Sequence, residues 1–154
     1  MRKPVGAESS PTVLSVSPSG EDGSSLERIF RESDLTLSPK FDWTLLASPS
    51  LASSVSILGE TPIAIVVCES ELLPGTWREV LEHLLVLPDP PLLIVTSRLA
   101  DERLWAEALN LGAYDVLAKP FNTSEVIRVL NSAWEHWRHR NEFRASRTTR
   151  TAAG

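Results

Sequence analysis

The residues best suited to chemistry in this chain stand where apolar segments end. Glu69 follows the run IAIVVC, Lys119 follows the run AYDVLA, and hydroxyl residues Ser17 and Ser97 close the runs TVLSVS and LLIVTS. A carboxylate and a lysine can form an ion pair, and hydroxyl groups can hydrogen-bond to it, if the fold brings these ends together. The sequence therefore directs attention to the ends of its apolar segments.

Metal and redox chemistry have weaker signals. Cys68 is the single cysteine, so the chain has no intramolecular disulfide and no cysteine-based zinc site. Because Cys68 lies inside an apolar run, we expect a small buried residue and not a redox sensor. His83, His136 and His139 form no metal-binding set with carboxylates at a suitable spacing.

Apolar segments alternate with amphipathic helices along the chain. We expect strands at Thr12–Ser17, Phe41–Ala47, Ile63–Cys68, Leu92–Ser97 and Ala113–Ala118. We expect helices around 26–30, around 51–58, at Thr76–Leu87, around 104–111, and from Thr123 to about Phe143. This alternation predicts an α/β fold, a three-layer doubly wound domain with a five-stranded parallel sheet. Function in such sheets lies at the carboxyl ends of the strands.

Length and composition predict one soluble domain. With 154 residues, we expect a disordered segment 1–10, a domain 11–140 and a basic flexible tail 141–154. No apolar run approaches the length that spans a membrane, and the N-terminus does not resemble a secretory signal. We therefore expect a cytoplasmic protein.

Charge is unevenly distributed. The net charge of −5 argues against general nucleic-acid binding. The end of the chain is basic, however, with Arg138, Arg140, Arg144, Arg147 and Arg150. Contact with nucleic acid is therefore expected only through this tail, and a solvated tail that keeps the protein soluble is the favoured interpretation.

The segment PPLLIVTSRLADERLWAEALNLGAYDVLAKPF, residues 90–121, resembles the receiver domains of two-component response regulators. In it an apolar strand ends in hydroxyl residues, a helix ends at a Gly-Ala pair, and Lys119-Pro120 closes the last strand. The resemblance covers roughly residues 11–137. It implies a flavodoxin-like sheet with the strand order 2-1-3-4-5.

Receiver domains accept a phosphoryl group from a histidine kinase on an aspartate after the third strand. The resemblance implies that this phosphoacceptor position falls on Glu69, or on Ser70 if the following loop is aligned by its proline. The acidic pair that binds magnesium after the first strand falls on Ser17 and Pro18, which offer no carboxylate oxygens. The nucleophile and the metal ligands of the family are therefore both replaced.

The family's phosphate-holding groups are retained. The switch hydroxyl falls on Ser97, with Thr96 as the alternative, and the lysine falls on Lys119 followed by Pro120. Glu21 and Asp22 could reach back toward the metal position, but we expect the start of the first helix to turn them to solvent. We therefore expect no cofactor and a lost magnesium site.

The resemblance implies an atypical receiver, a pseudo-receiver that is not an enzyme and acts through protein–protein contacts. Glu69 could pair with Lys119 and hold the site in an arrangement like the phosphorylated one, or the pair could be a remnant. The expected partner is another signalling protein, either a histidine kinase or a downstream effector. Trp105, Trp134 and Trp137 lie on the helices of the expected partner face, although we expect at least one of Trp134 and Trp137 to pack in the core. The last helix could mediate a homodimer.

Three alternatives remain open. The chain could be a conventional response regulator that is phosphorylated on Glu69 or Ser70. It could be a flavodoxin-like flavin or nucleotide binder whose phosphate loop is SPSGEDGSS, residues 17–25. It could be a nucleic-acid accessory protein that acts through its basic tail.

Overall fold

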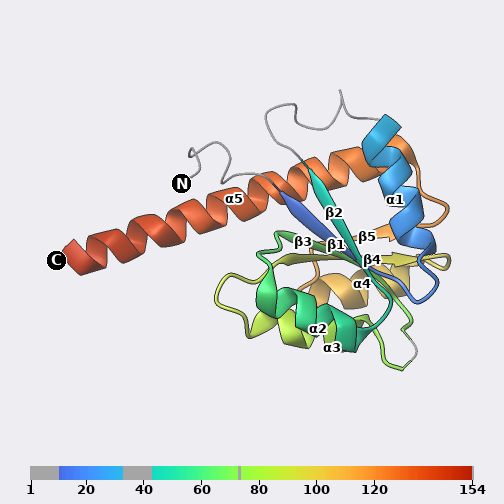
Figure 1. Cartoon of the computed structure of the whole chain (residues 1–154), viewed down its shortest axis with the longest axis horizontal. Helices are drawn as coiled ribbons and strands as arrows, with labels where there is room; N and C mark the ends of the chain where they lie inside the picture. The colour runs from blue at the N-terminus through green and yellow to red at the C-terminus, as the bar shows by residue number, and fades with distance from the viewer. Residues whose placement is uncertain (1–10, 33–42, 73, 154) are drawn as a thin grey trace.

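The computed structural model describes residues 11–32, 43–72 and 74–153, and of residues 143–153 it describes the backbone alone. In this part of the chain strands alternate with helices (Figure 1). The strands are β1 Thr12–Val16, β2 Thr44–Ser48, β3 Ile65–Glu69, β4 Leu92–Ser97 and β5 Asp115–Ala118. The helices are α1 Glu21–Glu32, α2 Leu51–Glu60, α3 Trp77–Leu85, α4 Glu102–Leu111 and α5 Thr123–Ala153.

The strands form one parallel sheet in the order β2-β1-β3-β4-β5. The predicted α/β class and strand order are therefore confirmed. Because all strands run the same way, their carboxyl ends lie at one edge of the sheet, and the register pairs Glu69 with Thr96 and Ser97 with Ala118.

Helices cover both faces of the sheet, as Figure 1 shows: α1 and α5 on one face, and α2, α3 and α4 on the other. Side chains alternate between the faces along each strand. Val13, Val67 and Ile94 belong to the core under α1 and α5, whereas Val66 and Val95 belong to the core under the other three helices. This strict alternation explains why the central strands are apolar without interruption.

Several predicted element ends shift. The third predicted helix, Thr76–Leu87, is two residues shorter at its end and begins at Trp77, because the Thr76 hydroxyl accepts a hydrogen bond from the Arg78 N–H and caps the helix. The predicted second strand begins later, at Thr44, and Phe41 lies outside the described residues.

Helix α5 is longer than predicted. The predicted end near Phe143 is wrong, because the helix continues to Ala153 and projects past the edge of the sheet (Figure 1). The division of the chain into 1–10, 11–140 and 141–154 stays a prediction, and its first segment lies outside the described residues. Within the described chain, no helix combines the length and the apolar character needed to cross a membrane.

Candidate functional site

The carboxyl edge of the sheet gathers charged and hydroxyl side chains around the Lys119 ammonium. Lys119 Nζ lies 2.8 Å from Glu69 Oε1 and 3.0 Å from Asp22 Oδ1, so one cation pairs with two carboxylates. The lysine side chain is 7% exposed and that of Asp22 is 1% exposed, whereas that of Glu69 is 25% exposed. We call Lys119, Glu69, Asp22 and the hydroxyls bound to them, Thr96 and Ser17, the strand-end cluster.

Asp22 is the member that the sequence interpretation missed. The expectation that it turns to solvent is wrong: Asp22 is buried, and only its neighbour Glu21 faces outward, where it pairs with Arg98. Successive helix positions differ by about 100°, so two neighbouring acids at the start of α1 can face different sides of the helix. Asp22 also stands four residues before Leu26 and seven before Ile29, on the buried face of α1. That spacing is a signal by which the sequence could have identified it.

Hydroxyl groups complete the cluster. Thr96 Oγ1 donates to Asp22 Oδ2 at 2.7 Å, and Ser17 Oγ donates to Glu69 Oε2 at 3.2 Å. Ser97, the preferred position for the switch hydroxyl, lies apart: its Oγ accepts a hydrogen bond from the Leu99 N–H at 3.0 Å. The structure thus joins Thr96 to the cluster in place of Ser97.

The two-residue period of the strands explains this choice. Thr96 follows Ile94, and Lys119 follows Leu117, both by two positions, and both apolar residues face α1 and α5. Glu69 follows Val67 in the same way. Glu69, Thr96 and Lys119 therefore lie on the face of the sheet that α1 covers, where Asp22 is also located. Ser97 is one residue away from Thr96 and points to the other face.

Electrostatics favour the charged form of the lysine. Burial alone would lower the pKa of Lys119, but hydrogen bonds to Glu69 and Asp22 and the attraction of both carboxylates outweigh it, so the pKa is raised. Next to the cluster, burial raises the pKa of the Cys68 thiol, and the negative charges of Glu69 and Asp22 raise it further. Cys68 is fully buried, in agreement with the expectation of a structural residue.

The chain is similar to known proteins in its structure and not in its sequence. No protein-family model and no curated protein sequence matches the chain. Solved structures do match it. The signal receiver domain of an HD domain-containing protein from Pseudomonas fluorescens shares 23% identity, with a TM-score of 0.65 over 84% of this chain and 98% of that one. A CheY-like receiver domain protein from Methanospirillum hungatei shares 13% identity, with a TM-score of 0.70 over 85% and 98%.

The beryllofluoride-activated NtrC4 receiver domain, solved as a dimer, matches with 20% identity and a TM-score of 0.69 over 82% and 98%. The fold is that of a receiver domain. The chain spans nearly the full length of each of these receiver domains, and its strand-end cluster lies at the edge of the sheet to which the sequence resemblance assigned the phosphorylation site.

The cluster of this receiver fold is a poor magnesium site. The position after β1 holds Ser17 and Pro18, and the two carboxylates that do approach, Asp22 and Glu69, both face the Lys119 ammonium. Magnesium requires hard oxygen ligands in a near-ideal octahedron, and a cation already lies between these oxygens. Among the described residues, no group of three or more histidine, cysteine, aspartate or glutamate side chains could hold a metal ion. The loss of the magnesium site stays a prediction, and the pairing of both carboxylates with Lys119 supports it.

The Lys119–Pro120 peptide bond of this receiver fold is cis, and Pro120 lies beside the cluster at the start of the β5–α5 loop. Ser70, the alternative phosphoacceptor position, donates its backbone N–H to the Thr96 carbonyl and is half-buried. Neither residue contributes a charged group to the cluster.

The three tryptophans predicted for a partner face separate. Trp134 is buried in the core, so its assignment to a partner face is wrong, and Trp137 stacks on it with ring centroids 5.4 Å apart. Trp105 on α4 is 40% exposed, next to exposed Leu109. Of the three, Trp105 is the most accessible to another protein.

Proposed function

We propose that this chain is a pseudo-receiver: a signalling module, not an enzyme, that acts by binding other signalling proteins without phosphorylation of an aspartate. The observation that carries the proposal is the Lys119 ammonium, buried between the carboxylates of Glu69 and Asp22. In the receiver family the lysine binds the phosphoryl group. Here carboxylates of the same chain occupy the lysine.

The proposal follows from charge. A phosphoryl group brought to Glu69 would add negative charge beside two carboxylates, with one ammonium to balance all of them and without a metal site that fits. Phosphoryl transfer depends on cations that neutralise the phosphoryl oxygens, so the cluster lacks what the reaction needs. The same ammonium instead ties β3, β5 and α1 together, which favours one fixed arrangement of the strand ends.

Such a module would pass on its signal through a surface that binds another protein. Trp105 and Leu109 on α4 expose apolar area beside the β4–α4 loop, which begins at the cluster. Aromatic residues are enriched among the residues that dominate binding energies. We propose a signalling protein, either a histidine kinase or a downstream effector, as the partner of this surface. A homodimer that includes α5 is a second arrangement, and one solved receiver domain of this fold is a dimer.

The alternative of a flavin or nucleotide binder has less support. Its phosphate loop would include Gly20 and the first turn of α1, where Asp22 and Glu21 carry negative charge. Glu21 faces outward on that turn, and the one ammonium near Asp22, that of Lys119, is already shared with Glu69, so a phosphate placed there would add negative charge to an acidic site.

The decisive experiment offers the protein a phosphoryl donor. The purified chain is incubated with magnesium and acetyl phosphate, and its intact mass is measured. In parallel, amide spectra are recorded with magnesium and beryllofluoride, with the NtrC4 receiver domain as the positive control. We expect no phosphoryl gain in mass and no shifts around Glu69, Thr96 and Lys119. A phosphoryl gain that Glu69→Gln or Ser70→Ala abolishes would establish a conventional response regulator instead.

A second measurement asks whether the cluster holds the partner surface. Glu69→Gln removes one of the two charges on Lys119 and leaves the shape nearly unchanged. If the cluster fixes the strand ends, amide signals in the β4–α4 loop and at Lys119 shift or broaden. Signals that change only within one residue of Glu69 mean that the ion pair is a remnant. The control is Glu125→Gln, a removal of charge at the start of α5.

A further inference from the structure

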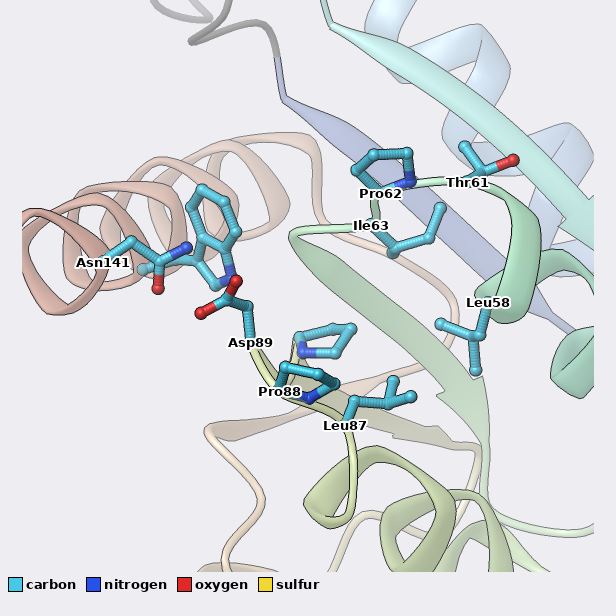
Figure 2. Close-up of a pocket in the computed structure, with 10 residues that line it drawn as sticks. Leu58, Thr61, Pro62, Ile63, Leu87, Pro88, Asp89 and Asn141 are labelled. Atoms are coloured by element: carbon cyan, nitrogen blue, oxygen red, sulfur yellow. The ribbon is translucent and has the colours of Figure 1, made fainter. Parts of the chain in front are cut away.

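The described contacts that hold α5 against the domain reach as far as Asn141. Trp137 and Asn141 line a hollow together with the α2–β3 connection and the α3–β4 loop (Figure 2), and the Arg140 guanidinium donates a hydrogen bond to the Pro90 carbonyl. Beyond these contacts the helix projects past the sheet and away from α1–α4 (Figure 1). We call residues 144–153, about 15 Å of helix, the α5 extension.

The α5 extension is basic without interruption. It carries Arg144, Arg147 and Arg150, and no acidic residue follows Glu142. The five arginines and single acid of 138–154 give +4, so the rest of the chain, whose total is −5, carries −9. Residues three positions apart are neighbours on a helix, and like charges at such a spacing repel each other. An anionic partner that neutralises the arginines would therefore stabilise this stretch of helix.

The helix dipole gives a second reason for basic residues near a helix end. It favours cations in the last turn and falls off within that turn. Arg150 stands in the last turn of α5, which ends at Ala153, but Arg144 and Arg147 lie further back. The dipole therefore does not account for the whole basic stretch.

The remaining residues of the α5 extension decide which kind of partner fits. All of them are small: Ala145, Ser146, Thr148, Thr149, Thr151, Ala152 and Ala153. Protein interfaces depend on large anchors such as tryptophan and tyrosine, and membrane-surface helices need an apolar face of tryptophan, phenylalanine or leucine. The extension has neither kind of residue. Arginine without apolar anchors is instead suited to the phosphates of a nucleic acid.

Helix geometry favours duplex DNA among the nucleic acids. Positions 144, 147 and 150 fall within about 120° of one another round the helix axis, so they share one side of the helix. The major groove of B-DNA is about 12 Å wide and admits an α-helix, and small residues allow that helix to approach the floor of the groove. The major groove of duplex RNA is too deep and narrow for this.

We propose that the α5 extension binds double-stranded DNA, with the helix in the major groove and Arg144, Arg147 and Arg150 on the flanking phosphates. DNA repels the acidic domain, and the projection of the extension keeps the two apart. With three arginines, the affinity is that of non-specific binding, with a dissociation constant on the order of 10⁻⁴–10⁻⁶ M. The extension is the end of α5 remote from the strand-end cluster, so the inference does not depend on the pseudo-receiver function.

The test measures binding of the full chain to a fluorescent DNA duplex by anisotropy. Three phosphate contacts give a slope of about −2.7 for the logarithm of affinity against that of salt concentration, so the affinity should fall about 40-fold between about 50 and 200 mM salt. The triple variant Arg144→Gln, Arg147→Gln and Arg150→Gln should bind at least about tenfold more weakly at the lower salt. The matched control, Arg28→Gln, Arg31→Gln and Arg103→Gln, removes the same charge from exposed positions on the domain and should stay within about threefold of wild type.

Ser146→Pro separates a helix in the groove from a flexible basic tail. It keeps every charge but interrupts the helix, so it should weaken binding at least about fivefold, whereas a flexible tail would bind as before. Duplex RNA and single-stranded DNA of the same sequence should also bind more weakly than duplex DNA. The proposal is overturned if duplex DNA does not bind at the lower salt, or if the triple variant binds like wild type. It is equally overturned if Ser146→Pro, folded by its amide spectrum, keeps full affinity, or if duplex RNA binds as well as duplex DNA.

Discussion

Replacement of Lys119 by methionine tests the strand-end cluster most directly. Methionine keeps much of the length and apolar character of the lysine stem but removes the ammonium, which leaves two carboxylates facing each other. Asp22 is 1% exposed, so little water can replace the lost cation there, whereas Glu69, at 25%, is better hydrated. Removal of one partner from a buried ion pair costs about 3–5 kcal/mol.

Urea unfolding measures this loss, and the fluorescence of buried Trp77 and Trp134 reports it. For a domain of this size, an m value of about 2 kcal/mol per molar urea is expected. The predicted loss therefore lowers the midpoint of unfolding by about 1.5–2.5 M, with the m value unchanged.

The matched control is Arg98→Met. Arg98 pairs with both carboxylate oxygens of Glu21 at 2.9 Å, but the two side chains are 68% and 56% exposed. An exposed pair of this kind contributes at most about 1 kcal/mol. If Lys119→Met costs no more than Arg98→Met, the cluster is not a buried charge network and the reasoning is wrong.

A double-mutant cycle tests the same pairing from the other side. Asp22→Asn keeps an oxygen that can accept from Thr96 but removes the charge. In the wild-type background it should be destabilising. In the Lys119→Met background it removes an uncompensated buried charge, so it should restore part of the lost stability, with a coupling energy of about 0.5–3 kcal/mol. Strictly additive effects contradict a direct Asp22–Lys119 interaction.

Three further predictions concern the surroundings of the cluster. Because the pKa of Lys119 is raised above its ordinary value of 10.5, its stabilisation is complete below that pH and is lost as the pH rises through the folded-state pKa. The unfolding free energies of wild type and Lys119→Met should therefore converge in alkaline urea titrations, and a constant difference contradicts this. Cys68 is buried and its pKa is raised, so it should resist a thiol reagent in the folded protein and react fully in denaturant. Rapid labelling without denaturant contradicts the burial. Thr96→Val leaves Asp22 Oδ2 without its hydrogen-bond donor and should lower the free energy of unfolding in urea by about 1–3 kcal/mol. Ser97→Ala should lower it by less, and the reverse order contradicts the assignment of Thr96 to the cluster.

The fold could be predicted from the sequence because apolar periodicity is strong in each of its layers. The prediction failed where periodicity stops. The sequence predicts an end near Phe143, which is the last large apolar residue of the chain. The helix continues because neither glycine nor proline interrupts 123–153 and because alanine and arginine, which recur in 144–153, favour helix.

The sequence predicts those site residues that directly follow a strand. Glu69 and Lys119 follow apolar runs, and parallel strands bring such residues to one edge. Asp22 was not found, because an acid beside another acid at a helix start is usually solvated, and its partners stand 74 and 97 residues away in the chain. Thr96 and Ser97 are neighbours on one strand, so their side chains point to opposite faces of the sheet. Thr96 shares the face of Ile94, and the choice between the two hydroxyls requires knowing that this face is the one covered by α1 and α5.

The cluster joins residues that are remote along the chain, with separations of 50 between Glu69 and Lys119 and of 97 between Asp22 and Lys119. Such contacts require the closure of large loops, and they form only after the sheet has brought its strand ends together. We therefore expect the cluster to be absent from the folding transition state. Its interactions then slow unfolding and leave the folding rate nearly unchanged, so that the cluster sets the lifetime of the folded domain.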